Sequence, residues 1–198
     1  MKHLFIKGSS THTIILLHGT GGNEHDLVPL AKAIDSHAHI LSIRGNIVEA
    51  GMPRFFKRTA PGIFDLENLK EETINLYDFM QEAEMTYGIN LNDATVIGYS
   101  NGANIASSVL LTYTNPLHRA ILLRPMVPFK SEINNRLDNT SLLILSSKND
   151  PIVAYEESDN LYHMFISRGA HTTHHWLNSG HQLTENDIKL AYNWYHQI

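Results

Sequence analysis

The chain has 198 residues, of which 42% are hydrophobic and 18% are charged, a balance typical of one folded domain and not of a disordered segment. Fifteen basic side chains stand against 20 acidic ones, and the formal net charge of −5 argues against a nucleic-acid partner. The chain has no cysteine, which excludes disulfides, cysteine zinc sites and a cysteine nucleophile.

Short β-rich runs alternate with amphipathic segments along the chain. Strands are predicted at residues 4–7, 13–18, 39–43, 94–99, 119–123, 141–147 and 172–177. Helices are predicted at residues 26–36, 66–87, 101–113, 155–168 and 184–196. Several strands are apolar at successive positions, as parallel strands buried on both faces are. The pattern predicts one α/β domain over residues 1–198, with a mostly parallel sheet covered by helices on both faces.

The remaining segments are loops, and the longest of them is residues 45–65, which contains Gly51, Pro53, Pro61 and Gly62. Loops of this length in a compact domain are usually functional or mobile. The apolar runs are strand-length and too short for a membrane span, and the first residues lack the apolar region of a secretory signal. We therefore expect a soluble, cytoplasmic protein.

The most informative motif is Gly98-Tyr99-Ser100-Asn101-Gly102, a G-x-S-x-G sequence between a predicted strand and a predicted helix. A sharp strand-to-helix turn of this kind projects the serine hydroxyl above the sheet. Glycines are needed on either side because side chains there would collide with the neighbouring strand and helix. The alternative is a tight turn with a solvated serine, and the strand before and helix after favour a nucleophile.

A nucleophilic serine needs a base that takes its proton and an acid that orients the base. In this fold class the acid and then the base follow the serine, each beyond the carboxyl end of a later strand. Asp150 follows the strand 141–147, although a turn residue before proline is the alternative interpretation. Among 13 histidines, His181 alone occupies the loop after the last predicted strand. We predict Asp150 as the acid and His181 as the base.

An oxyanion hole needs two backbone N–H groups aimed at the developing negative charge. Asn101, the residue after the serine, is one predicted donor. Thr20 is the other, in the glycine-rich segment after the strand 13–18. The same glycines also fit a turn that caps the next helix. They do not form the G-K-[ST] or G-x-G-x-x-G pattern of a nucleotide-binding loop.

His171, His174 and His175 raise the question of a metal site. His171 and His174 would point to opposite faces of an extended strand, and no acidic residue lies among them. The pattern favours a polar edge strand, so we predict neither a metal nor a cofactor.

Four segments together resemble the α/β-hydrolase superfamily: the glycine-rich residues 18–22, the G-x-S-x-G motif at 98–102, Asn149-Asp150-Pro151 and Gly180-His181. The compact size, without a cap domain, is similar to the phospholipase/carboxylesterase and acyl-protein thioesterase branch, sometimes grouped with dienelactone hydrolases. Residues 42–46 and 51–56 are similar to bacterial carboxylesterases linked to hydroquinone and catechol stress. The resemblance covers essentially the whole chain. It implies a Ser100, Asp150 and His181 triad, with an oxyanion hole formed by the amides of Thr20 and Asn101.

The sequence departs from this pattern in two places. It lacks the cysteine nucleophile of dienelactone hydrolases, which argues against lactone chemistry of that type. Arg124 follows the strand 119–123, at a pocket-wall position where the resemblance leads us to expect a small or histidine-type residue.

We therefore predict a carboxylesterase that cleaves small carboxylic esters, acts as a monomer or homodimer, and has neither a nucleic-acid partner nor a membrane span. The alternatives are a thioesterase on acylated proteins or acyl carriers, and a non-catalytic binding or sensing protein. Apolar loop residues are the predicted pocket walls, although each could also pack on the core: Met52, Phe55, Phe56, Met126 and Val127. Arg54, Lys57 and Arg58 could favour an anionic substrate, but a solvated loop face is the favoured interpretation.

Overall fold

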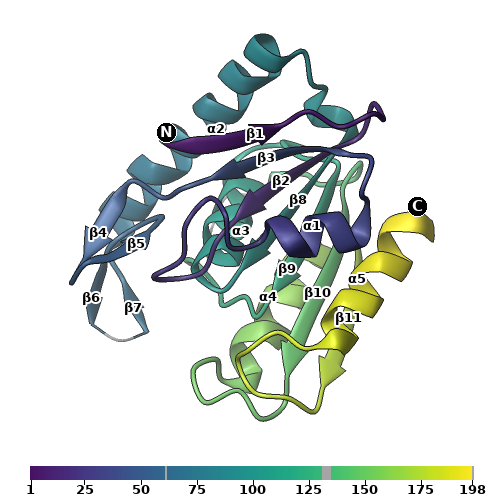
Figure 1. Ribbon diagram of the computed structural model, residues 1–198. Helices are drawn as coiled ribbons and strands as arrows, with labels where there is room; N and C mark the ends of the chain where they lie inside the picture. The colour runs from purple at the N-terminus through teal and green to yellow at the C-terminus, as the bar shows by residue number, and fades with distance from the viewer. Residues whose placement is uncertain (61, 131–134, 198) are drawn as a thin grey trace.

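A seven-stranded, mostly parallel sheet forms the centre of the molecule (Figure 1). The computed structural model describes residues 1–60, 62–130 and 135–197. Across the sheet the strands run in the order β1 (His3–Ile6), β3 (His39–Ile43), β2 (Thr13–Leu17), β8 (Ala94–Tyr99), β9 (Arg119–Leu123), β10 (Ser141–Ser147) and β11 (His171–Leu177). Strand β1 is antiparallel to β3, and every other neighbouring pair is parallel. The predicted fold class, an α/β-hydrolase architecture, is confirmed.

Helices cover both faces of the sheet and divide the apolar core into two layers (Figure 1). Helices α1 (Val28–Ile34) and α5 (Glu185–Gln197) cover one face. The other face is covered by α2 (Leu66–Tyr87), α3 (Asn101–Thr112) and α4 (Tyr155–Ser167). Successive residues of β2 enter opposite layers, which explains why this strand is apolar at every position after its first.

The predicted elements agree closely with the structure. Four of the seven predicted strands have the predicted bounds, two differ by one residue at one end, and the first is shifted by one residue. The largest difference is α1, which begins at Val28 and not at residue 26. Pro29 lies in its first turn, where a missing N–H costs nothing, and the backbone becomes extended at Asp35.

The segment predicted to be irregular contains two small hairpins. Strands β4 (Ile47–Glu49) and β5 (Met52–Arg54) form the first, with Ala50 and Gly51 at positive φ in the turn. Strands β6 (Arg58–Ala60) and β7 (Ile63–Phe64) form the second. Strands of two or three residues are too short to show a periodic pattern, so the sequence did not reveal them.

A short 3-10 helix at Leu91–Asp93 connects α2 to β8. Asp65 caps the start of helix α2, where its side chain accepts a hydrogen bond from the Asn68 N–H, and Gly88 follows the helix in the left-handed conformation. Within the described ranges, none of the helices is both long and apolar enough to cross a bilayer.

Strand β11 lies at the edge of the sheet, and its exposure alternates along its length. His171 and His175 are exposed, whereas His174 is half-buried and its Nε2 lies 2.9 Å from Ser146 Oγ. In the part of the chain that the structure describes, no three histidine or carboxylate side chains are grouped as a metal site. The predicted polar edge strand agrees with this arrangement.

Replacing His174 with glutamine is expected to flatten the acid dependence of stability. Burial, assisted by His175 and His163 and opposed by Asp159, lowers the pKa of His174 to about 4. In the unfolded chain this pKa returns to about 6.5. The unfolded state therefore binds the extra proton between these values, and stability is lost as the pH falls from about 6.5 through 4. Denaturant unfolding between pH 4 and 7 should show a loss on the order of 2 kcal/mol that the variant lacks.

His175→Gln is the matched control, because this histidine is exposed on the same strand. It should keep most of the acid dependence. An equal loss of stability on acidification in His174→Gln and in the unsubstituted chain would contradict the assignment.

Candidate active site

Ser100 lies at the turn between β8 and α3, above the carboxyl edge of the sheet. Its φ of 52° and ψ of −112° are strained for a residue with a side chain. A Cβ atom at Gly102 would collide with the backbone of Leu17 and His18, and one at Gly98 would lie 2.5 Å from the Gly102 carbonyl oxygen. Only glycine permits this close approach of helix to sheet, so the G-x-S-x-G motif produces the turn that its spacing predicts.

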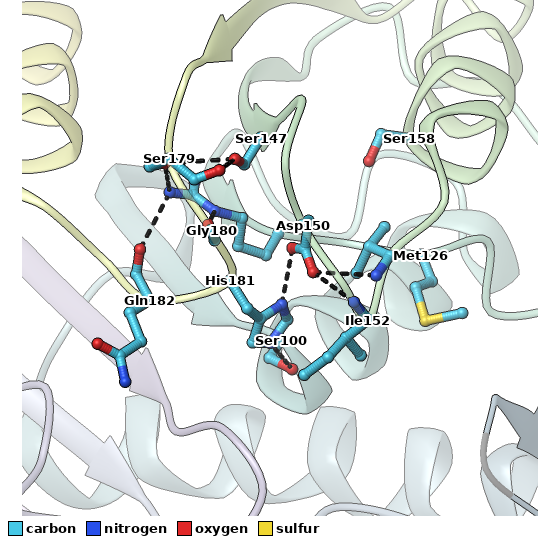
Figure 2. A network of polar contacts seen from close by, with 12 residues as sticks. Ser100, Met126, Ser147, Asp150, Ile152, Ser158, Ser179, Gly180, His181 and Gln182 are labelled. Carbon is cyan, nitrogen blue, oxygen red and sulfur yellow. Dashed lines mark hydrogen bonds and ion pairs between the residues drawn. The ribbon is translucent and has the colours of Figure 1, made fainter.

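The structure brings Ser100, His181 and Asp150 into one hydrogen-bonded chain (Figure 2). His181 Nε2 lies 2.9 Å from Ser100 Oγ, and His181 Nδ1 lies 2.7 Å from Asp150 Oδ2. The Asp150 side chain is 1% exposed and that of His181 is 14% exposed, so the imidazole reaches solvent while its carboxylate partner does not. This is the arrangement in which a base can take the serine proton and the carboxylate can stabilise the resulting cation.

The Asp150 carboxylate is held on its other side by backbone N–H groups. Asp150 Oδ1 accepts hydrogen bonds from the N–H of Ile152 at 2.8 Å and from that of Val153 at 3.0 Å (Figure 2). Asp150 is therefore a turn residue, as the alternative interpretation held. The same turn orients its other oxygen, Oδ2, toward His181. The two interpretations of Asp150 are compatible.

The two predicted oxyanion donors lie near Ser100. Asn101 is the first residue of α3, where a backbone N–H has no partner within the helix, and Thr20 lies in the loop after β2. Neither N–H has an acceptor among the described residues. Both residues line a cavity together with Ser100. Both N–H groups can therefore donate hydrogen bonds to an oxygen atom that enters this cavity.

Buried polar contacts hold the Thr20 loop in place. His18 Nδ1 donates to the Gly19 carbonyl at 2.7 Å, and its Nε2 accepts from the Gly45 N–H at 3.1 Å. Because Nε2 accepts a hydrogen bond, the ring is neutral. Burial also favours the neutral ring, since it lowers the pKa of His18. The Gly21 N–H donates to the Pro53 carbonyl at 2.9 Å, which ties the loop to the first hairpin. This role of His18 was not apparent from the sequence, in which it is one of 13 histidines.

Arg124 does not form the pocket wall that its position after β9 suggests. Its side chain is fully buried beneath the His181 loop, and the residue adopts a positive φ of 55°. The guanidinium donates to both carboxylate oxygens of Asp187, at 2.7 and 3.0 Å. It also donates to the carbonyls of Gly180 and Gln182, the two neighbours of His181, at 3.2 and 3.3 Å. Arg124 therefore anchors the loop that carries the base.

A cavity of about 440 Å³ opens next to Ser100. Met126 lines it as predicted. The prediction was wrong for Phe55 and Phe56, which are 1% and 0% exposed and belong to the core layer on the side of α2, α3 and α4.

The other two predicted wall residues also lie outside the cavity's described lining. Met52 is 38% exposed and packs near Gly21, on the first hairpin. Val127 packs against the core and donates its N–H to Glu157. Loop residues alternate in direction, and the sequence did not show which of them face Ser100.

Residues 6–197 match the sequence profile of the phospholipase/carboxylesterase family, within the α/β hydrolases. The chain belongs to this family. As a family member it is a hydrolase of the carboxylesterase type, and the resemblance predicted from its motifs is confirmed.

Proteins similar to this phospholipase/carboxylesterase family member include two relatives identified by sequence and one solved structure. The protein MhqD of Bacillus subtilis is 45% identical over 195 residues, which cover 98% of each chain. A carboxylesterase of Bacillus cereus has a crystal structure that is 48% identical and covers 100% of this chain and 94% of its own, with a TM-score of 0.97. Acyl-protein thioesterase 1 of Cryptococcus neoformans is 30% identical over 176 residues, which cover 78% of this chain and 74% of the relative.

Proposed function

We propose that this carboxylesterase-family chain cleaves small carboxylic esters through an acyl-enzyme on Ser100. The observation that carries the proposal is the continuous hydrogen-bonded chain from Asp150 through His181 to Ser100, with 2.7 and 2.9 Å between the bonded atoms. An isolated serine has a poorly nucleophilic hydroxyl, and a base at hydrogen-bond distance removes this limitation.

In the proposed first half-reaction, Ser100 Oγ attacks the ester carbonyl carbon while His181 Nε2 takes the serine proton. The carbonyl oxygen becomes an oxyanion that accepts hydrogen bonds from the Thr20 and Asn101 N–H groups. The carbon–oxygen bond to the alcohol then breaks, and His181 gives its proton to the departing alcohol. Asp150 keeps the proton of the neutral imidazole on Nδ1, so that Nε2 is free to act as the base.

In the second half-reaction, water attacks the acyl-enzyme and gives a proton to His181. The bond between the acyl carbon and Ser100 Oγ breaks, and the proton returns to Ser100. The products are one carboxylic acid and one alcohol. The two half-reactions use one water molecule and the named groups of this chain, and no atom is oxidised or reduced.

Thioester hydrolysis is the second candidate, supported by the 30% identity to an acyl-protein thioesterase. It uses the same nucleophile and base and differs only in the leaving group. Comparing kcat/KM for matched oxygen esters and thioesters of the same acyl group separates the two candidates.

A fluorophosphonate probe is expected to label Ser100 in the folded chain and to leave Ser100→Ala unlabelled. The probe reacts with a serine only when a neighbouring base makes it nucleophilic. Mass spectrometry of the digested protein locates the adduct. Ser167→Ala is the matched control and should keep the label, because Ser167 is exposed at the end of α4. A folded protein without an adduct on Ser100 would contradict the proposal and favour a non-catalytic binding protein.

A further inference from the structure

Two arginines line the cavity that contains Ser100. Arg54 comes from the end of β5 and Arg58 from the start of β6, and both share the cavity with Ser100 and Asn101. The sequence favoured a solvated loop face for both. Arg54 instead has a side chain only 5% exposed, and Arg58 is 33% exposed. The neighbouring Lys57 is exposed and does not line the cavity within the described residues.

The described contacts leave several guanidinium donors unused. Arg54 donates from Nη1 to Thr20 Oγ1 at 3.0 Å and from Nε to the Phe56 carbonyl at 3.2 Å. Arg58 donates from Nε to Glu49 Oε2 at 2.8 Å. Nη2 of Arg54 and both terminal nitrogens of Arg58 have no hydrogen-bond partner within residues 1–60, 62–130 and 135–197. A guanidinium presents five donors, so both side chains can bind a further acceptor.

The local charge is also incompletely balanced. Arg54 and Arg58 share one carboxylate, because Glu49 Oε2 lies 3.6 Å from Arg54 Nη1 and 2.8 Å from Arg58 Nε. Two positive charges thus face one negative charge at the cavity. Burying a charge without full compensation is unfavourable, and an anionic group in the cavity relieves that cost. Arginine also matches the planar geometry of a carboxylate with two parallel hydrogen bonds.

The lining of the cavity suits the acyl part of an ester better than the leaving alcohol. Its described lining comes from the Thr20 loop, the two hairpins, the start of α3 and the loops after β9 and β10. The leaving alcohol must depart beside His181, which protonates it, and the His181 loop contributes none of the described lining residues. Phe64, Met126 and Ile152 supply apolar wall for a short carbon chain between the carbonyl and the arginines.

We propose that the cavity binds the free carboxylate of a dicarboxylic acid half ester, with Arg54 and Arg58 as its ligands. The inference rests on Ser100 as the nucleophile and specifies the acyl group that it takes. The ester carbonyl lies at Ser100, and the far carboxylate pairs with the two guanidinium groups. Hydrolysis converts the half ester and one water into a dicarboxylate and an alcohol.

The test compares two substrates that differ only in this charge. One is the mono-4-nitrophenyl ester of a dicarboxylic acid, and the other carries a methyl ester on the far carboxyl group. A series from glutaric to suberic acid varies the distance between the carbonyl and the carboxylate. At the best length, kcat/KM is expected to be about tenfold or more higher for the free acid, as for a charged hydrogen-bonded pair.

Arg54→Gln and Arg58→Gln are each expected to lower the ratio of the two kcat/KM values by about tenfold. Using the ratio removes the effect of Arg54 on the Thr20 loop, since both substrates use the same nucleophile and oxyanion donors. Lys57→Gln is the matched control, because it removes one positive charge from the same loop outside the cavity. It should leave the ratio unchanged.

Fluorophosphonate labelling of Ser100, measured on the same preparations, separates the two proposals. If Ser100 is labelled and the methyl-capped esters react as fast as or faster than the free acids at every length, the half-ester inference is overturned and the esterase proposal stands. A preference for free acids that survives in both arginine variants also overturns it. Absence of both labelling and turnover overturns both proposals.

Discussion

Replacing Asp150 with asparagine is expected to lower kcat/KM for ester hydrolysis by about 10⁴-fold, the size of effect seen when a triad carboxylate becomes an amide. The side-chain oxygen of asparagine can still accept from the N–H groups of Ile152 and Val153, so the turn should persist. The amide NH₂ then faces His181 Nδ1 and donates to it. The ring proton moves to Nε2, which can no longer accept the Ser100 proton. Steady-state kinetics on an activated ester measure the loss.

Asp159→Asn controls for the change in net charge. Asp159 lies on α4 with a side chain 40% exposed, in contact with exposed His163. This variant should keep the kcat/KM of the unsubstituted chain. If Asp150→Asn folds normally and loses less than about tenfold in activity, Asp150 does not act as the acid of a triad.

Replacing Asp187 with alanine is expected to destabilise the fold by about 3–5 kcal/mol, because it leaves a buried arginine without its counter-ion. The Arg124 and Asp187 side chains are 0% and 1% exposed. Asp187 Oδ2 also accepts from the Thr184 N–H and hydroxyl, both at 2.8 Å, at the start of α5. Denaturant unfolding measures the free energy of unfolding, and the ester assay measures the activity that remains in the folded fraction.

The double variant Arg124→Leu with Asp187→Leu separates stability from positioning. An apolar pair avoids the unpaired charge, so its loss of stability should be smaller than that of Asp187→Ala. Activity should stay about 100-fold low, because the carbonyls beside His181 no longer have the guanidinium that holds them and a small displacement of the base is costly. Full activity in a stable double variant would show that the pair has no role in positioning His181.

The surface pair Arg136 and Asp138 is the matched control for this ion pair. Its side chains are 60% and 49% exposed, and solvent screens their attraction. Arg136→Met should leave both stability and activity unchanged within error. The contrast isolates burial as the reason for the large effect at Arg124 and Asp187.

The order of strands and helices could be predicted because the buried parallel strands are short apolar runs separated by amphipathic helices. Residues just beyond the carboxyl ends of parallel strands meet at one edge of the sheet. For that reason the positions of Ser100, Asp150 and His181 after β8, β10 and β11 were enough to select them. Their proximity in the structure agrees with that selection.

The direction of side chains in the loops depended on tertiary contacts. Phe55 and Phe56 were predicted to face the substrate but pack in the core, whereas Arg54, predicted to face solvent, is buried beside Thr20. Hairpins of two and three residues per strand leave no periodic pattern from which these directions could be read.

The role of Arg124 also depended on a tertiary contact, in this case between residues far apart in the sequence. Its position after β9 suggested a pocket wall, but its partner Asp187 lies 63 residues later in the chain. By itself, the sequence determined the family, the fold class and the residues proposed for catalysis, because these follow from local motifs and from the order of the elements. The tertiary structure alone decided which charges are buried, which loops they hold and which of them line the cavity beside Ser100, because burial depends on contacts between segments far apart in the sequence.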